Sequence, residues 1–388
     1  MRGLVLTPET KSVSLQDVPT PTPGPTQILV RVRAVALNIV DPLYVVMPMA
    51  TQNRVIGSDF AGEVTQVGEG LSGLDDARAK VGAHVAGFLQ GAGSANDRPG
   101  AFAEYLVIDY DLAWSVPASL SLEQASTINL CGLTAAQGVF ARLQLPCPFY
   151  KTEGFQDLDL NSSEPVNILV YGATSSVGLY AAQLIKIAEQ TSGRKIRLIG
   201  AASASKHALL RAAPYHYDVL VDYRDSSWTE KVREATRDSS GVHYAVDAIS
   251  IGPTIGQVES TLVPKGKFVA YRSPEAGNFD LAALKIKPII GAVWEGLGEE
   301  IVYHGGVTIP ADPEARKFAV EYYNFLGSGR ESDKVLLQPN PTRQMPGGLE
   351  SIIPEGFTLI GPTKVEQSGE SQKVHLRPVS GEKIVYSI

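Results

Sequence analysis

A run of small residues between positions 172 and 178 is the segment of this chain best suited to hold a phosphate group. It follows Val166–Tyr171, a continuous apolar run that predicts a buried parallel strand, and it precedes apolar residues at helical spacing from Val177 to Ala188. A helix that begins here offers unpaired backbone N–H groups and a partial positive charge, and small side chains leave room for a pyrophosphate. The pattern predicts phosphate contacts from Gly172, Thr174, Ser175, Ser176, Val177 and Gly178.

The loop departs from the strict G-x-G-x-x-G spacing of dinucleotide sites. Ala173 and Ser175 stand where the first two glycines would be, and only Gly178 matches the third. On its own, the loop fits equally well a purely structural helix entry in some other α/β protein.

The end of the next predicted strand, Ile196–Ser203, favours a phosphorylated ribose. A ribose with a free 2′-hydroxyl is usually bound by an Asp or Glu about 20 residues past the glycine loop. This chain has hydroxyls and Lys206 there instead, which suit a 2′-phosphate and therefore NADPH rather than NADH. Tyr223, after the predicted strand Val219–Asp222, is expected at the same phosphate. The predicted group is Ser203, Ala204, Ser205, Lys206 and Tyr223.

Two regions of different pattern must position these residues. Up to about Leu130, short β-type runs alternate with Gly and Pro and predict a β-rich, barrel-like domain. After Pro146, strands alternate with helix-length segments, which predicts a doubly wound parallel sheet with right-handed crossovers. The further strands expected are Gln27–Val35, Gly62–Val67, Ala83–Phe88, Ala101–Val107, Tyr244–Ile249 and Phe268–Tyr271. A helix over Asp312–Leu326 and a last strand over Lys383–Tyr386, returning to the β-rich domain, complete the prediction.

Composition narrows the classes of partner. The chain has 388 residues, enough for two domains, and a net charge of −7, which gives no electrostatic reason for a nucleic acid or an anionic membrane to bind. The first residues lack a basic region followed by an apolar run, and no apolar stretch is long enough to span a bilayer, so a cytoplasmic protein is expected. Cys131 and Cys147 cannot supply a four-ligand structural zinc site; a disulfide between them would be unusual in the cytosol.

Seven ordered blocks resemble the medium-chain dehydrogenase/reductase superfamily. They are Pro21–Pro25, Ala36–Asp41, Ile56–Val64, Pro99–Tyr105, Leu133–Ala136, Tyr171–Gly178 and Ser380–Lys383. The resemblance implies an α/β fold made of two parts: a GroES-like β-barrel catalytic domain and a Rossmann doubly wound parallel sheet that binds NADPH. The expected ranges are 1–135 with 330–388 for the barrel domain and 136–329 for the Rossmann domain.

The blocks differ from those of the zinc-dependent alcohol dehydrogenases of the superfamily. Those enzymes hold a catalytic zinc with a Cys in the block that here reads Asn38 to Asp41, and with a His followed by Glu where this chain has Ser58 and Asp59. Because thiolate and imidazole ligands are missing at these places, no metal is expected, and the oxidation of alcohols is disfavoured.

Among zinc-free members, the chain most resembles the fungal trans-acting enoyl reductases. The likeness lies in the Ser-Gly-Glu-Lys ending at 380–383, the long loop before Val166, and Asp222-Tyr223-Arg224. It implies a reductase that works with NADPH in secondary metabolism, beside a highly reducing polyketide synthase without an enoyl reductase of its own. The expected substrate is an α,β-unsaturated thioester on an acyl carrier protein.

The same resemblance implies roles for further residues. Thr134 is the first choice for orienting the nicotinamide or the developing oxyanion, with Asn38 as the second catalytic candidate. Leu43 stands where relatives can carry a Lys, so any cationic contribution from that position is lost. Additional cofactor contacts are expected from Val40, Asp41, Pro42, Leu43, Tyr271, Arg272, Ser380 and Gly381. The acyl chain is expected along Ala135, Ala136, Gln137, Gly138, Val139, Phe140, Ala141 and Arg142, and along Ile290, Gly291, Ala292, Val293 and Trp294.

Other functions remain open at this point. The chain could reduce free quinones, alkenals or enones, or it could be a non-catalytic partner protein that binds nucleotide. Without the resemblance, ordinary helix and strand packing would be the preferred interpretation of the two acyl-chain segments. The irregular sequence after Ala292, with Trp294 and two glycines, favours a monomer over a dimer formed through an edge strand.

Overall fold

The computed structural model describes residues 1–94, 98–155, 164–303, 308–361 and 373–388. Contacts within the chain divide it into two compact units. The first unit comprises residues 1–130 and 294–388, and the second unit comprises residues 131–293.

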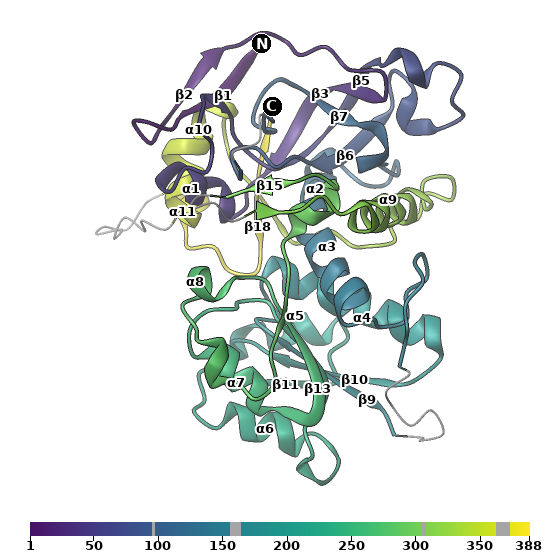
Figure 1. The fold of residues 1–388 in the computed structure, drawn as a ribbon, viewed down its shortest axis with the longest axis vertical. Helices are drawn as coiled ribbons and strands as arrows, with labels where there is room; N and C mark the ends of the chain where they lie inside the picture. Colours follow the sequence, from purple (N-terminus) through teal and green to yellow (C-terminus); the bar gives the residue numbers. More distant parts are fainter. Residues whose placement is uncertain (95–97, 156–163, 304–307, 362–372) are drawn as a thin grey trace. The chain divides into compact units, whose positions relative to one another are not determined.

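The first unit is built on β-structure (Figure 1). Its largest sheet has the strand order β17-β18-β3-β5-β6-β8, with β7 also paired to β3, and a smaller sheet has the order β2-β1-β4. A further antiparallel pair joins β15 and β16. The strands are β1 (Arg2–Thr7), β2 (Ser12–Asp17), β3 (Gln27–Ala36), β4 (Arg54–Val55), β5 (Asp59–Val67), β6 (His84–Phe88), β7 (Tyr105–Asp109), β8 (Ala113–Ser115), β15 (Ile301–Val302), β16 (Thr308–Ile309), β17 (Thr342–Gln344) and β18 (Lys383–Ser387).

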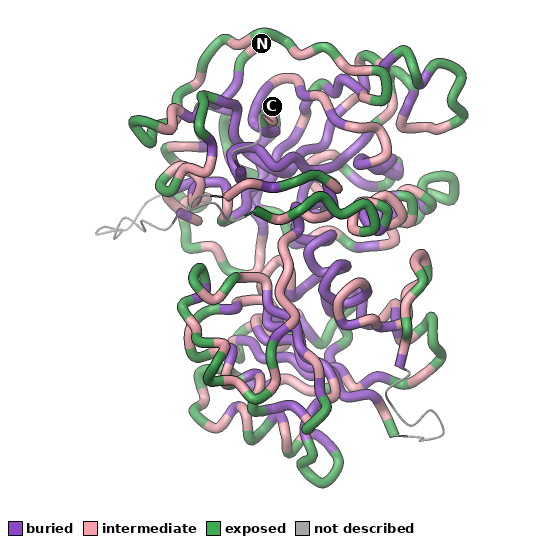
Figure 2. Tube along the Cα trace, in the orientation of Figure 1, coloured by how far each residue is buried: buried purple, intermediate pink, exposed green. Residues whose placement is uncertain are grey.

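The central pair of this sheet, β3 and β5, requires a glycine. A Cβ atom added at Gly62 would lie 2.2 Å from the carbonyl oxygen of Arg31, so a side chain there would push the two strands apart. Residues of β3 are buried on both faces over most of the strand, as a strand inside a closed or covered sheet requires (Figure 2). The predicted return of the C-terminus is confirmed, because β18 pairs antiparallel with β3.

The helices of the first unit are short except for one. They are α1 (Val40–Val46), α2 (Leu122–Ser126), α9 (Pro313–Gly327), α10 (Leu349–Ser351) and α11 (Thr358–Ile360), and α3 (Asn129–Ala136) begins at its boundary. Helix α9 confirms the helix predicted over Asp312–Leu326, and its N-cap Asp312 accepts hydrogen bonds from the amides of Glu314 and Ala315.

The compact units divide the chain at different places from the ranges expected from sequence. The ranges placed 294–329 with the Rossmann domain and 131–135 with the barrel, whereas the contacts assign each segment to the opposite unit. The physical reason for the larger difference lies in α9, which packs against β8 and against the short helix η3 (Tyr110–Leu112). Arg316 of α9 also pairs with Asp111 at 2.9 Å and with Asp109 at 3.2 Å.

The second unit contains a six-stranded sheet in which all the strands run parallel. The strand order β11-β10-β9-β12-β13-β14 is that of a doubly wound nucleotide-binding sheet, and the order reverses at β9. The strands are β9 (Val166–Tyr171), β10 (Ile196–Ala201), β11 (Val219–Val221), β12 (Val242–Asp247), β13 (Leu262–Ala270) and β14 (Ile289–Ile290). The helices are α4 (Ser176–Ser192), α5 (His207–Arg211), α6 (Trp228–Glu234), α7 (Thr254–Ser260) and α8 (Pro274–Gly277).

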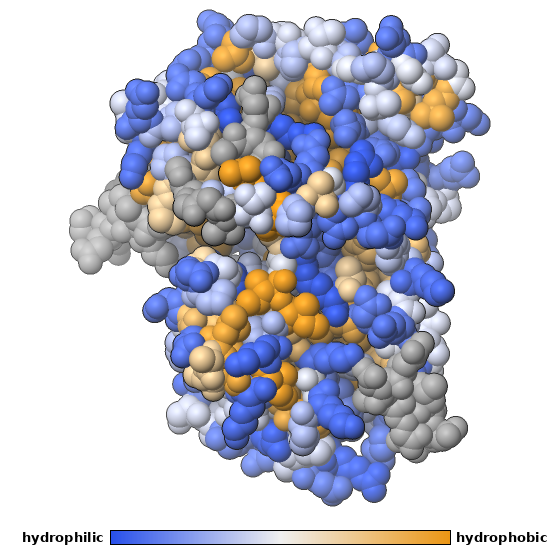
Figure 3. All heavy atoms as spheres, in the orientation of Figure 1, coloured by the Kyte–Doolittle hydropathy of each residue, from blue (hydrophilic) through white to orange (hydrophobic). Residues whose placement is uncertain are grey.

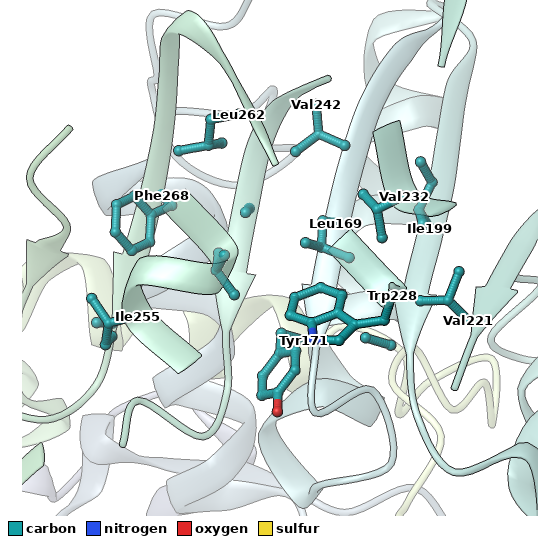
Figure 4. Packing of buried hydrophobic residues seen from close by; sticks show 14 residues of the cluster. Leu169, Tyr171, Ile199, Val221, Trp228, Val232, Val242, Ile255, Leu262 and Phe268 are labelled. Carbon is teal, nitrogen blue, oxygen red and sulfur yellow. The ribbon is translucent and has the colours of Figure 1, made fainter. Parts of the chain in front are cut away.

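An apolar core covers one face of this sheet (Figure 4). Alternate residues of the strands, such as Leu169 and Ile199, pack against Trp228 and Val232 of α6 and against Ile255 of α7. The other strand residues, for example Ile168 and Val170, are also fully buried, so both faces are covered. This is why the strand Val166–Tyr171 appears in the sequence as an unbroken apolar run.

Apolar side chains also reach the surface of the second unit (Figure 3). Leu284, Ile286 and Ile290 pack on the edge of the core cluster and stay partly exposed. At this edge β14 contains only two residues.

Candidate functional site

The loop between β9 and α4 lies where the strand order of the second sheet reverses, which is the usual ligand position in such sheets. Gly172 has a φ of +72°, and a Cβ there would lie 2.6 Å from the Ile249 side chain. A Cβ at Gly178 would lie 2.3 Å from the carbonyl oxygen of Gly172. Both positions therefore need glycine, and together they hold the first turn of α4 against the loop.

The first turn of α4 presents amides to this loop. Ser175 is the N-cap, and its hydroxyl accepts a hydrogen bond from the amide of Gly178 at 3.1 Å. The amides of Ser176 and Val177, the first two of the helix, have no carbonyl partner within the helix. Residues Thr174 to Val177 are partly exposed, so an anion can reach these amides. The predicted phosphate residues thus lie together in the geometry that a pyrophosphate needs.

The predicted 2′-phosphate residues also lie together, at the ends of β10 and β11. The hydroxyls of Ser203 and Tyr223 are 3.5 Å apart, and the short helix η5 (Ala204–Lys206) follows Ser203 directly. Tyr223 is 39% exposed and packs edge-on against Tyr171, the last residue of β9. This arrangement brings hydroxyls and the Lys206 segment to one edge of the sheet.

A carboxylate to which the sequence analysis assigned no role, that of Asp222, lies beside this group. Asp222 accepts hydrogen bonds from the amides of Ala204 at 3.1 Å and Arg224 at 3.0 Å, and these two bonds lower its pKa. The carboxyl ends of adjacent parallel strands meet at one edge, so the pairing of β10 with β11 was the signal that could have found it. Asp222 holds the turn at Ala204 and Arg224.

Tyr271 follows β13 and has a buried hydroxyl without a partner among the described residues. Burial raises the pKa of this phenol well above its ordinary value, so the group stays protonated and remains a donor. Its amide donates to the hydroxyl of Ser250 at 2.9 Å, and Ser250 in turn is held by the Asp247 carboxylate at the end of β12. An unused buried donor at the ligand edge of the sheet fits a bound dinucleotide. Asp247 and Ser250 were not identified from the sequence.

The two segments predicted to lie along an acyl chain are brought together within the second unit. Gln137 donates to the carbonyl of Val293 at 3.4 Å, and Arg142 donates to the carbonyl of Ala292 at 3.4 Å. Gly291 lies directly under the Arg142 guanidinium, where a Cβ would be 2.3 Å from it. The first segment runs from α3 into the wide helical turn η4 (Gln137–Arg142), where Val139 and Phe140 are fully buried. Contact of these segments with an acyl chain stays a prediction.

Thr134 lies on α3, and its side chain is 7% exposed. Trp294, the last residue predicted in the acyl segment, belongs to the first unit, where it is buried against Phe88 with ring centroids 5.8 Å apart.

The first unit places Asn38 in a buried cluster of charged and polar groups. Lys383 donates to Asp59 at 2.5 Å, to the Asn38 side-chain oxygen at 3.0 Å and to the carbonyl of Thr127 at 3.3 Å. The Asn38 amide group donates to Asp59 at 3.0 Å, and the other Asp59 oxygen accepts from the amide of Leu130 at 2.8 Å. Lys383 and Asp59 are almost fully buried. The described bonds therefore engage Asn38 with protein partners rather than leaving it aimed at a ligand.

Asp41 lies next to this cluster, in the first turn of α1. Asp41 accepts hydrogen bonds from the Ser58 hydroxyl at 2.8 Å and from the backbone amide of Asn38 at 2.7 Å. Burial raises the pKa of Asp41 to about 7, because these two hydrogen bonds only partly offset the loss of water around the charge. Val40, Pro42 and Leu43 share the helix with Asp41, and in the described residues of the C-terminal segment Ser380 is exposed and Gly381 has a φ of +67°.

The residues at the zinc position of related folds do not fit zinc. Ser58 is committed to Asp41, Asn38 is an amide, and the ammonium of Lys383 lies within hydrogen-bonding distance of Asn38. The Asp41 and Asp59 carboxylates beside them already accept from Ser58, Asn38 and Lys383, and the cluster offers neither the thiolate nor the imidazole that zinc prefers. Across the ranges given above, no group of three or more His, Cys, Asp or Glu side chains is arranged to hold a metal. Cys131 and Cys147 are both free thiols, and burial raises the pKa of Cys147 to about 11.

Comparisons of the amino-acid sequence with known proteins identify relatives of this chain. The alcohol dehydrogenase GroES-like domain family matches residues 24–118. A trans-enoyl reductase of Xenoacremonium sinensis is 31% identical over 384 residues, covering 96% of this chain and 91% of the relative. An enoyl reductase of Chaetomium globosum is 29% identical over 374 residues, covering 95% of this chain and 92% of the relative.

The chain belongs to the trans-enoyl reductase family.

Solved structures agree with this family fold. The enoyl reductase CurK superposes with a TM-score of 0.68 over 100% of this chain and 98% of its own, at 18% identity. A mycobacterial protein solved with NADPH superposes with a TM-score of 0.64 over the full length of both chains, at 19% identity. At such identities these structures show the fold, which is the GroES-like barrel with a doubly wound nucleotide-binding sheet. The predicted fold class is confirmed.

As a member of this family, the chain is an oxidoreductase acting on carbon–carbon double bonds. No helix in the portions of this trans-enoyl reductase that the structure describes is both long and apolar enough to cross a membrane.

Proposed function

We propose that this protein is an NADPH-dependent, trans-acting enoyl reductase. It reduces the α,β-double bond of a polyketide enoyl thioester carried on the acyl carrier protein of a partner polyketide synthase. The observation that carries the proposal is the likeness to a trans-enoyl reductase at 31% identity, which extends over nearly the whole chain.

NADPH is the proposed cofactor. The glycine-held loop and the free first amides of α4 suit the pyrophosphate, and the unpartnered Tyr271 hydroxyl offers a further donor. The paired hydroxyls of Ser203 and Tyr223 suit a 2′-phosphate, with Lys206 supplying charge. The Asp222 carboxylate accepts from two backbone amides, so part of its acceptor capacity already serves to hold the turn. A structural neighbour with NADPH bound supports the same choice.

The chemistry requires positioning more than side-chain reactivity. When bound, the reduced nicotinamide supplies a hydride to the β-carbon of the substrate. The protein must orient the thioester, stabilise negative charge on its oxygen and exclude water. We assign the orienting role to Thr134, whose hydroxyl is a donor on a nearly buried helix face. Water delivers the proton to the α-carbon.

The test is turnover of an enoyl thioester by purified protein. We expect oxidation of NADPH with a crotonyl or longer enoyl thioester, and faster turnover when the same chain is attached to the carrier protein of a partner synthase. Reduction of quinones or enones alone would instead establish an enzyme of free small molecules. NADPH binding without turnover of any acceptor would establish a non-catalytic partner protein.

We also propose that the protein acts as a cytoplasmic monomer. Edge strand β14 spans only two residues, which offers little backbone for sheet-to-sheet pairing between copies. Sedimentation at the concentrations used for turnover checks this proposal, and a dimer would contradict it.

A further inference from the structure

The carboxylate of Asp59 connects three separate segments of the first unit. One oxygen accepts from Lys383 of β18 and from the Asn38 side chain just before α1, and the other accepts from the amide of Leu130 in the first turn of α3. Lys383 lies 324 residues from Asp59 in the chain, so the fold alone brings these groups together.

Each connected segment carries residues that the proposed reaction uses. Asn38 precedes Val40 to Leu43, Lys383 follows Ser380 and Gly381, and Leu130 lies one helical turn before Thr134. The first two sets are proposed to contact the cofactor, and Thr134 is proposed to orient the reacting groups. One buried carboxylate is therefore bonded to the backbone or side chain next to every one of these sets.

The cluster is densely hydrogen-bonded. The buried ammonium of Lys383 donates to Asp59, to the Asn38 side-chain oxygen and to the carbonyl of Thr127. A buried ion pair adds little net stability compared with well-packed apolar residues, and its best-attested use is to fix one geometry among several. Both features indicate a geometric role.

We propose that Asp59, with Lys383, is a positioning residue that sets α1, the start of α3 and the Ser380–Gly381 segment in register for the reaction. It touches neither the cofactor nor the substrate and acts through the groups bonded to it. This inference rests on the proposed function.

The experiment compares two charge-neutral double variants. Asp59→Asn with Lys383→Met removes the cluster's ion pair without leaving a buried charge alone. The control, Asp111→Asn with Arg316→Met, removes the ion pair between η3 and α9, which lies in the same unit and carries no residue of the proposed site. Thermal unfolding, the Kd for NADPH and kcat with an enoyl thioester are measured for both.

A positioning role predicts a split between the two variants. The Asp59/Lys383 variant should keep a cooperative unfolding transition while kcat falls about 10- to 100-fold, as expected for reacting groups displaced by about 1 Å. The NADPH Kd should rise by a smaller factor, because the phosphate loop belongs to the second unit. The control variant should keep the wild-type kcat and Kd. Equal behaviour of the two folded variants would overturn the proposal and leave the cluster a purely structural one.

A single variant decides the case if the double variant fails to fold. Asp59→Glu keeps the charge and the ion pair but lengthens the side chain by one methylene, so it should retain the fold and still lower kcat. An unchanged kcat in a folded Asp59→Glu protein would overturn the proposal.

A failure of the proposed enoyl reductase function can be told apart from a failure of the positioning role by the behaviour of the wild-type chain. A wild-type chain that reduces quinones but no enoyl thioester would refute that substrate, and the same variants would then be compared with quinone as acceptor. A wild-type chain that binds no NADPH would overturn both proposals.

Discussion

The two units hold their proposed site residues by opposite means. In the second unit, residues 172–178 and 203–206 are close in sequence, partly exposed, and shaped by helix capping and glycine. In the first unit, Asn38, Asp59 and Lys383 are far apart in sequence, buried, and joined by an ion pair. One local turn can form a binding surface for a phosphate. Segments that are far apart in the sequence need an interaction between distant residues, such as the Asp59–Lys383 ion pair, to hold them together.

The difference in burial predicts a difference in how the two regions respond to change. Groups in contact with water can lose a ligand contact without disturbing the fold, because solvent replaces the lost partner. Groups buried in a hydrogen-bonded cluster cannot, because an unpaired buried charge is costly. Substitutions at the exposed residues of the second unit should therefore alter binding with little effect on stability, whereas those in the buried cluster of the first unit should alter stability and its dependence on pH as well as turnover.

The largest effect should come from Gly178→Ala. The new Cβ would collide with the carbonyl of Gly172, so the loop must move away from α4. We expect the NADPH Kd to rise by about 100-fold, since a shift near 1 Å takes the amides away from the phosphate. Fluorescence titration measures this. Gly193→Ala, at the other end of α4, carries a cost of its own because Gly193 has a positive φ of +68°, but a Cβ there meets nothing within 4 Å, so the variant should bind NADPH normally. An equal loss of NADPH affinity in both variants would contradict the explanation that the collision with the Gly172 carbonyl causes the effect.

The next prediction concerns the first unit and the dependence of its stability on pH. Asp41 has a pKa of about 7 in the folded chain, raised from 3.8 chiefly by burial. A raised carboxyl pKa favours folding fully below the unfolded value, and this contribution is lost as the pH rises towards 7. Relative to Asp41→Asn, the wild type should lose stability between about pH 4 and 7, by at most about 1.4 kcal/mol per pH unit.

Urea unfolding at several pH values measures this difference. The groups that face Asp41 in the structure are Ser58, Asn38, Asp59 and Lys383, and Asp59 raises its pKa while Lys383 lowers it. A difference between wild type and variant that is constant from pH 4 to 8 would show that Asp41 is not held in its protonated form.

The smallest effect should be that of Lys206→Ala. Loss of a charge-assisted contact with the 2′-phosphate should weaken NADPH binding by about 1.5 kcal/mol, roughly tenfold, and leave NADH binding unchanged. Lys195→Ala is the matched control, since Lys195 is an exposed lysine just before β10, at the opposite end of the strand. Equal losses for NADPH and NADH would contradict a 2′-phosphate contact.

Most of the regular structure could be predicted from sequence. The strand Val166–Tyr171 is confirmed at both ends, because an apolar run bounded by Pro165 and Gly172 leaves little freedom in its limits. The strand expected at Ala101–Val107 instead lies at Tyr105–Asp109. Residues 101–103 are buried, but the amides of Ala101 and Phe102 donate to Gly57 and Ile56 outside the strand ladder, so burial alone misplaced the element.

The site was less fully predicted. The position of the loop at the start of α4 and the proximity of Ser203 to Tyr223 could be predicted because helix entries and strand ends have local signatures, and phosphate binding there stays a prediction. Asp222 and Asp247 were missed, since each acts on backbone amides of a turn and resembles any other polar residue after a strand. The catalytic role expected for Asn38 stays a prediction; the structure adds that its side chain bonds to Asp59 and Lys383, which the sequence did not indicate.

The sequence by itself determined the two fold types, the small-residue turn that leads into α4 and the lack of Cys and His at the zinc positions, because each depends on residues that are neighbours in the chain. Only the tertiary structure decided that Lys383 lies against Asp59, that burial raises the pKa of Asp41 to about 7, and that α9 packs with the first unit. These properties depend on burial and on contacts between distant segments, and neither leaves a periodic or local pattern in the sequence.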